Sequence, residues 1–301
     1  MRKSHPRGAP RAKRPFHPAE RIMRVVFGAC GVLAIAFVAV ITGYLLVSGI
    51  PAIREIGLLP FLLGTTWQPG SDQYGIAPVI LTSIYGTLGA ILIGVPLGLL
   101  FAIFLGKMCP KRLYTPIRYA VDLLAGIPSV VYGLVGMIVL VPCIQTVFHK
   151  AYGQGLLAAI VVLAVMVLPS IISVSETALR AVPREYEEAS LALGATWNET
   201  VFKVSFPAAK SGIAAAVVLG IGRAVGEAMA VMMVCGNVAN MPALFTSVRF
   251  LTTAIAGEMG YSSGLHRQAL FSVALILYIF IMVINLILNL FLKRRAGEGA
   301  K

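Results

Sequence analysis

The sequence predicts an all-α membrane protein with six transmembrane helices, and three observations indicate this class. Hydrophobic residues make up 58% of the 301 positions and charged residues only 12%, whereas a soluble domain carries roughly 25% charged residues. Six apolar stretches are each long enough to cross a hydrocarbon core, which takes about 20 helical residues. Basic residues gather in alternate connections between these stretches. Lipid is therefore the solvent for most of this chain.

The six predicted spans follow the apolar stretches in chain order. The first stretch is too long for a cleaved signal peptide, and no small-residue cleavage site follows it, so we expect it to stay in the protein. We place the spans near Val25–Val47, Val79–Leu105, Ala120–Ile144, Leu156–Val174, Ile213–Cys235 and Ala269–Leu292.

The lysine and arginine distribution orients these spans. Twenty of the 25 basic residues lie in the tail before residue 25, in 106–119, in 175–212 and in the C-terminal tail. Four lie in the alternate connections, and Arg223 lies inside a span. Lysine and arginine accumulate on the cytoplasmic side, so we expect a multi-pass protein of the cell inner membrane with both termini in the cytoplasm. The net charge of +13 then reflects topology rather than a nucleic-acid partner.

The domain organisation follows from the same distribution. Residues 1–21 are basic, rich in proline and without apolar periodicity, which predicts a disordered cytoplasmic tail. Residues 22–295 form the membrane domain, and 296–301 form a short C-terminal tail. The four cysteines contain no CxxC pair, and we expect neither a metal site nor a disulfide framework.

The long outer connection, residues 48–78, contains the aromatic residues Phe61, Trp67 and Tyr74. Two interpretations remain open from the sequence. These residues form an aromatic belt at the membrane interface, or the segment belongs to a docking surface for an outside partner.

Several spans contain residues that weaken helices. Proline removes a backbone donor and kinks a helix, and a GxxxG pair permits close helix contact. Together these features favour a moving bundle over a rigid anchor. They are Gly94 and Pro96, Gly126 and Pro128, Pro142, Pro169, and the GxxxG pair Gly222 and Gly226.

The segment 182–207 between spans four and five predicts a helical hairpin. Pro183 suits a first helical turn and is followed by acidic residues that complement the helix dipole. Gly194 is placed to end the helix in a left-handed cap. Thr196 to Glu199 forms a capping box that starts the second helix, and Pro207 stands near its end. The residues alone leave open an ordinary loop hairpin or a docking helix for a cytoplasmic partner.

The spacing in this hairpin resembles the EAA loop of ABC importer permeases, which is Glu-Ala-Ala, three residues, Gly, nine residues, Ile-x-Leu-Pro. The matching residues here are Glu188, Ala189, Ser190, Gly194, Val204, Phe206 and Pro207, with mild departures at Ser190, Val204 and Phe206. The resemblance implies that the first helix is a coupling helix, which docks on a nucleotide-binding subunit. The chain has no Walker A pattern of its own, so a separate subunit must bind ATP. We therefore expect no catalytic residues and no cofactor in this chain.

Arg223 and Glu227 are charged residues predicted near the middle of span five. A charge at the bilayer centre costs roughly 2.5–3.5 kcal/mol and is functional by default. Because the two residues are four apart, we expect them to share one helix face. They form either a self-neutralising ion pair that holds the bundle together, or an anion site in which Arg223 contacts the substrate and Glu227 balances it.

The stretch from Gly220 to Asn237 resembles span five of the PstC family of phosphate importer permeases. The stretches 125–133 and 251–260 resemble the same family, and the likeness covers about residues 22–295. It implies a type I ABC importer permease with the MetI-like fold, in which Arg223 and Glu227 serve phosphate passage. It also implies four kinds of partner: a PstA-like permease, two copies of a PstB-like ATPase, a PstS-like phosphate-binding protein, and phosphate itself.

Three rival functions remain. The same architecture could carry sulfate or molybdate. An ion-coupled carrier or anion channel would explain Arg223 and the broken spans, would leave the EAA spacing unexplained, and should work without ATP. A membrane scaffold without transport is the third.

Overall fold

The computed structural model describes residues 18–298. The chain divides into two units, residues 1–47 and 48–301. The described part of the first unit is a single helical segment of α1 (Pro18–Ile56), which contains the predicted span Val25–Val47. Of the predicted tail 1–21, residues 1–17 lie outside the described residues, and α1 begins at Pro18. At the other end α14 continues through Glu298, beyond the predicted boundary at 295.

The second unit is almost entirely helical, which confirms the predicted fold class. Its helices after α1 are α2 (Leu58–Leu63), α3 (Ala77–Ile103), α4 (Lys111–Gly126), α5 (Ser129–Val135), α6 (Val141–Phe148), α7 (Leu156–Arg180), α8 (Arg184–Ala192), α9 (Trp197–Thr200), α10 (Phe206–Ala208), α11 (Lys210–Gly226), α12 (Met229–Val234), α13 (Leu251–Glu258) and α14 (Gly264–Glu298). Short 3-10 or π-helical segments are η1 (Pro69–Ser71), η2 (Phe104–Met108), η3 (Gly136–Leu140) and η4 (Val201–Ser205). A two-stranded antiparallel hairpin pairs β1 (Trp67–Gln68) with β2 (Gln73–Tyr74).

Five helices of the described part are long and apolar enough to cross a membrane, and a bent pair makes a sixth if it is counted as one span. The bent pair is Trp197–Ala208 with Lys210–Gly226, at 70°. Two predicted spans are wrong as continuous helices. The one at Ala120–Ile144 breaks between Gly126 and Ser129, and the one at Ile213–Cys235 breaks between Gly226 and Met229.

Helices α3 and α7 form the central seam of the second unit. Small residues recur at every fourth position of α3 and all are buried: Gly86, Ala90, Gly94, Gly98 and Ala102. A Cβ atom built on Gly94 would lie 2.6 Å from Val167 Cγ2, and one on Gly98 would lie 2.8 Å from Ile171 Cγ2. Small residues let membrane helices approach this closely. Gly94 and Pro96, named above as residues that weaken helices, do not interrupt this one, because α3 runs unbroken through both.

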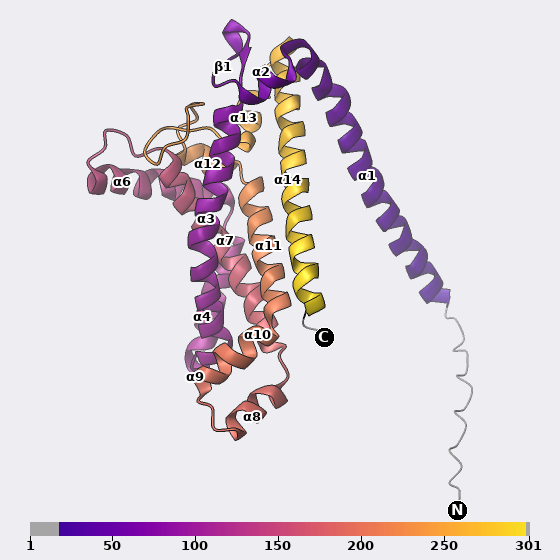
Figure 1. Ribbon diagram of the computed structural model, residues 1–301, viewed down its shortest axis with the longest axis vertical. Coiled ribbons are helices and arrows are strands. Elements are labelled where there is room, and N and C mark those ends of the chain that lie inside the picture. The colour runs from indigo at the N-terminus through magenta and orange to yellow at the C-terminus, as the bar shows by residue number, and fades with distance from the viewer. Residues whose placement is uncertain (1–17, 299–301) are drawn as a thin grey trace, which may run out of the picture. The chain divides into compact units, whose positions relative to one another are not determined.

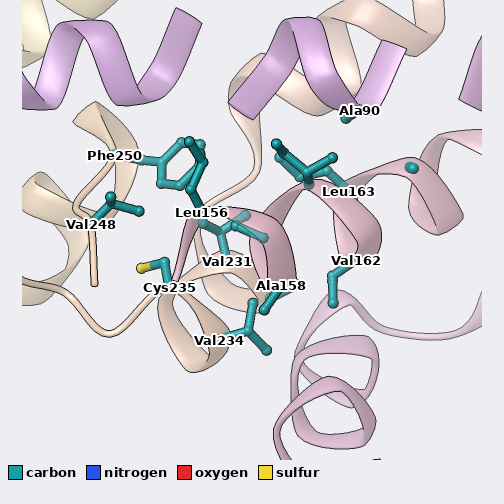
Figure 2. Close-up of a cluster of buried hydrophobic side chains, with 14 of the residues drawn as sticks. Ala90, Leu156, Ala158, Val162, Leu163, Val231, Val234, Cys235, Val248 and Phe250 are labelled. Atoms are coloured by element: carbon teal, nitrogen blue, oxygen red, sulfur yellow. The ribbon is translucent and has the colours of Figure 1, made fainter. Parts of the chain in front are cut away.

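The second unit has two ends, which Figure 1 shows. The hairpin end is defined by α8 and α9, and the opposite end by α2, β1 and α13. Helices α3, α7 and α11 run between them, and α14 packs beside α11. A cluster of buried side chains from α7, α12 and the start of α13 fills the core toward the opposite end, with Leu156, Val231 and Phe250 in contact (Figure 2).

The outer aromatic residues of the segment 48–78 are core residues. Phe61, Trp67 and Tyr74 are buried in one apolar cluster with residues of α3, α13 and α14. The interpretation of these three as an interfacial belt is therefore wrong. The chain folds back through the β1–β2 hairpin, so its aromatic side chains point into the protein.

The GxxxG pair of α11 does not pack against another element in the part of the chain that the structure describes. A Cβ atom on Gly222 or on Gly226 would meet nothing within 4 Å, whereas one on Gly220 would lie 2.9 Å from Ile171 Cγ1. The expected close contact therefore belongs to Gly220, and Gly222 and Gly226 lie on an exposed face.

Candidate functional site

The predicted ion pair of span five is separated by the helix break. Arg223 lies in the last turn of α11, while Glu227 has extended backbone with φ −73° and ψ 128°. The Glu227 carboxylate accepts a hydrogen bond at 3.0 Å from the backbone nitrogen of Ala230, in the first turn of α12, and its carbonyl accepts one from Thr252 Oγ1 at 2.8 Å. The two residues do not share a helix face as expected, because Glu227 leaves the α11 helix to cap α12.

Arg223 borders a cleft of about 520 Å³. The cleft lies between α7, α11 and α14, and its polar residues besides Arg223 are Ser170 and Asn285. The Tyr132 hydroxyl of α5 donates to the Leu124 carbonyl at 2.6 Å across the α4–α5 break. Within residues 18–298, Arg223 has no carboxylate in ion-pair distance. A half-buried guanidinium without a counter-ion offers planar donors for an anion.

The predicted hairpin is confirmed. Helix α8 ends at Ala192, and Gly194 adopts φ +89°, which places its left-handed turn where the sequence predicted it. Thr196 and Glu199 form the expected capping box. Pro183 is the residue before the helix rather than its first turn.

The EAA residues occupy distinct places in this hairpin. Glu188 and Ala189 are exposed on α8, where a partner can contact them. The Ser190 hydroxyl lies 2.9 Å from Thr200 Oγ1 and joins the two helices of the hairpin. Pro207 lies in α10, just before the chain bends into α11.

Two buried carboxylates at the hairpin end were missed by the sequence analysis. Glu176 of α7 is 2% exposed and accepts a hydrogen bond from the Tyr114 hydroxyl at 2.8 Å. It also forms ion pairs with Arg118 of α4 and, at 2.9 Å, with Arg180. Glu187 of α8 is 8% exposed and pairs with Lys107. Acidic residues at the ends of apolar stretches, with basic residues in the neighbouring connection, were the available signal.

A third missed carboxylate, Glu258, organises the opposite end. It accepts hydrogen bonds from Trp67 Nε1 at 3.0 Å, lies 2.8 Å from His266 Nε2, and pairs with Arg249. These groups come from β1, α14 and the segment before α13. Burial alone would raise the Glu258 pKa, but His266, Trp67 and Arg249 together hold this pKa below its usual range.

We expect the substitution Glu258→Gln to destabilise the opposite end by roughly 3 kcal/mol at neutral pH, because it leaves Arg249 in a mostly buried place without a counter-charge. The lowered pKa means that ionised Glu258 stabilises the fold above the unfolded pKa and that this contribution is lost as pH falls through the folded pKa. The melting temperature of the detergent-solubilised chain, measured from pH 7 to pH 3, checks both. The variant should melt lower at pH 7 and lose less stability on acidification. Equal melting curves for variant and parent across that range would contradict the assignment.

The fold and the hairpin together define a class: a helical bundle with a broken span and a projecting EAA hairpin is the membrane subunit of a type I ABC importer. The family described as "Binding-protein-dependent transport system inner membrane component" matches residues 94–297. The chain belongs to this family, and curated relatives named PstC are among its members most similar to this chain.

The similarities to individual proteins extend over most of the chain. The "Probable ABC transporter permease protein YqgH" of Bacillus subtilis is 38% identical, covering 90% of each chain. The "Phosphate transport system permease protein PstC" of Mesorhizobium japonicum is 34% identical, covering 93% of this chain and 92% of the relative. Among solved structures, the inward-facing MetNI methionine ABC transporter aligns with a TM-score of 0.60 at 22% identity, covering 76% of this chain and 99% of that one. The last similarity establishes the MetI-like fold.

Proposed function

We propose that the chain is the transmembrane permease subunit of an ABC importer that moves inorganic phosphate into the cytoplasm, with ATP hydrolysed on a separate subunit. The observation that carries the proposal is Arg223, a half-buried guanidinium at the break of span five without an ion-pair partner among residues 18–298. The 34% identity to a phosphate transport permease supports phosphate as the anion. Transporters commonly form their substrate sites at discontinuous helices, and Arg223 lies in the last turn before such a break.

The orientation of the chain follows from its charges. We infer that the hairpin end faces the cytoplasm, because the connections 106–119 and 175–212 at that end carry eight lysine and arginine residues, against four in 48–78, 145–155 and 236–268 together. The exposed helix α8, with Glu188, Ala189 and Gly194, is then the surface for a PstB-like ATPase, and Ser190 and Pro207 hold its geometry. The opposite end receives a PstS-like phosphate-binding protein.

The exposed face of α11 supports a second permease as partner. Gly222 and Gly226 present bare backbone beside Arg223, and a Cβ atom on either would meet nothing within 4 Å among residues 18–298. A PstA-like permease that packs there would close the path around the guanidinium. Glu227 serves the path indirectly in this arrangement, since its carboxylate caps α12 and so holds the break open beside Arg223.

Reconstitution tests the proposal directly. The chain is assembled in proteoliposomes with PstA-like, PstB-like and PstS-like partners, and uptake of radiolabelled phosphate is measured with ATP, without ATP and with a non-hydrolysable analogue. We expect phosphate uptake only with ATP. Excess sulfate or molybdate should not compete.

Each rival function predicts a different result in the same assay. Uptake without ATP or without the ATPase subunit would favour an ion-coupled carrier or a channel. Competition by sulfate or molybdate would indicate that this anion, rather than phosphate, is the transported substrate. An assembled complex that moves none of these anions would contradict the proposal.

A further inference from the structure

Glu187 of the coupling hairpin joins three separate segments through buried contacts. Lys107 Nζ lies 2.5 Å from Glu187 Oε1, and Ser205 Oγ donates to the same oxygen at 2.6 Å. The side chains of Lys107 and Glu187 are 9% and 10% exposed, and Ser205 is fully buried. Because this ion pair is shielded from water, separating its two partners would leave an uncompensated buried charge. The contact therefore favours one arrangement of the segments that it joins.

The two partners of Glu187 both come from π-helical segments. Lys107 lies in η2, which continues α3 from Ile103, and Ser205 ends η4, which leads through α10 toward the bend into α11. A π-helical turn is rare and is found mostly at functional positions. In this protein both described turns at the hairpin end meet at one carboxylate of α8.

A further contact strengthens the same connection. Trp197 Nε1, at the start of the second hairpin helix, donates to the backbone carbonyl of Lys107 at 3.1 Å. The coupling hairpin is thus attached to the end of α3 by a side-chain ion pair and by a backbone hydrogen bond. The ion pairs of Glu176, by contrast, go to Arg118 of α4 and to Arg180 of its own helix α7.

We propose that Glu187 and Lys107 form the positioning link that transmits movement of the coupling helix α8 to the transmembrane helix α3. Without it, the connection of α8 to the bundle would rest on the chain at residues 181–183, on η4 and on the Ser190–Thr200 contact with α9. Because α3 packs tightly on α7, a pull on Lys107 moves both helices. This inference rests on the proposed function, since it assumes an ATPase that moves α8.

The test compares the phosphate transported per ATP hydrolysed in the reconstituted complex. Lys107→Met and Glu187→Gln should still assemble and hydrolyse ATP but lower this ratio about fivefold or more, which is the lower end of typical allosteric coupling between two sites. The charge swap Lys107→Glu with Glu187→Lys should recover a large part of it. Asp122→Asn, which removes only the exposed partner of Arg118, is the matched control and should keep the parental ratio. Unchanged ratios in assembled single variants, or a swap no better than either single variant, would overturn the inference.

Two further measurements keep the result decisive. If the single variants fail to assemble, Ser205→Ala, which removes one donor and keeps the ion pair, should give an intermediate ratio; a parental ratio would then count against the link. Amide hydrogen exchange of residues 100–108, with and without ATP, separates this inference from the proposed function. An ATP-dependent change in the parent that is lost in Lys107→Met supports the link whatever the transported anion, and the same change in both contradicts it.

Discussion

Replacing Arg223 by alanine is expected to reduce phosphate uptake ten- to a hundredfold while leaving assembly intact. A hydrogen bond to a charged group contributes about 1.5–3 kcal/mol, and each 1.4 kcal/mol corresponds to a factor of ten. The side chain is half-buried at the edge of a cleft and has no ion-pair partner among residues 18–298, so its removal leaves no buried charge unpaired. Initial rates of phosphate uptake in proteoliposomes, normalised to the amount of assembled complex, measure the effect.

Two matched variants distinguish anion recognition by the Arg223 guanidinium from the effect of its positive charge alone and from the structural effect of the cap on α12. Arg223→Lys keeps the charge and loses the planar fork, and we expect an intermediate rate. Glu227→Gln keeps an oxygen that can cap α12, and we expect a rate closer to the parent than that of Arg223→Ala. Parental uptake by Arg223→Ala at equal assembly would remove this residue from the substrate path.

Replacing Gly75 by alanine is expected to cost about 3 kcal/mol or more of stability at the opposite end. A Cβ atom on Gly75 would lie 2.3 Å from the carbonyl carbon of Gly64, where only backbone is present to move. Overpacking that displaces backbone costs 1–3 kcal/mol and occasionally more. The two segments that contain Gly64 and Gly75 are also joined by a hydrogen bond from Ala77 N to Gly64 O at 3.0 Å. The added methyl group would break this hydrogen bond.

The fluorescence of Trp67 reports this change in a Trp197→Phe background, where Trp67 is the single tryptophan. The parent should show a cooperative loss of Trp67 burial on heating, and Gly75→Ala should show it at a clearly lower temperature. Gly70→Ala is the control, because a Cβ atom there meets nothing within 4 Å. Equal transition temperatures for the Gly75 and Gly70 variants would show that the segment absorbs the added atom.

The sequence predicted the spans and the hairpin because both depend on local signals. Apolar length marks a helix in lipid, and the left-handed Gly194 and the Thr196–Glu199 capping box are read within a few residues of one another. The EAA spacing added the role of the hairpin through resemblance. These features need no knowledge of which residues meet across the fold.

The missed features depend on where a helix ends or on which distant segments meet. Helical periodicity placed Arg223 and Glu227 on one face, but the α11 helix ends between them and Glu227 caps the next helix. Trp67 resembles an interfacial residue until the β1–β2 hairpin turns it toward Glu258, 191 positions along the chain. Composition also cannot tell a glycine that breaks a helix from one that packs a seam, and Gly94 belongs to the second kind.

The seam of small residues between α3 and α7 sets the size of any step that the two helices can take past each other. Its buried positions recur every four residues, a repeat of about 6 Å along the helix axis. A slide of half that length would drive side chains such as Val167 and Ile171 against the larger residues between the glycines. Only a displacement by a full repeat would restore complementary surfaces, so smaller slides of α3 along α7 are disfavoured. Helices α3 and α7 are therefore suited to move as one rigid body. Rotation would then occur at the bend of 70° between the second hairpin helix and α11.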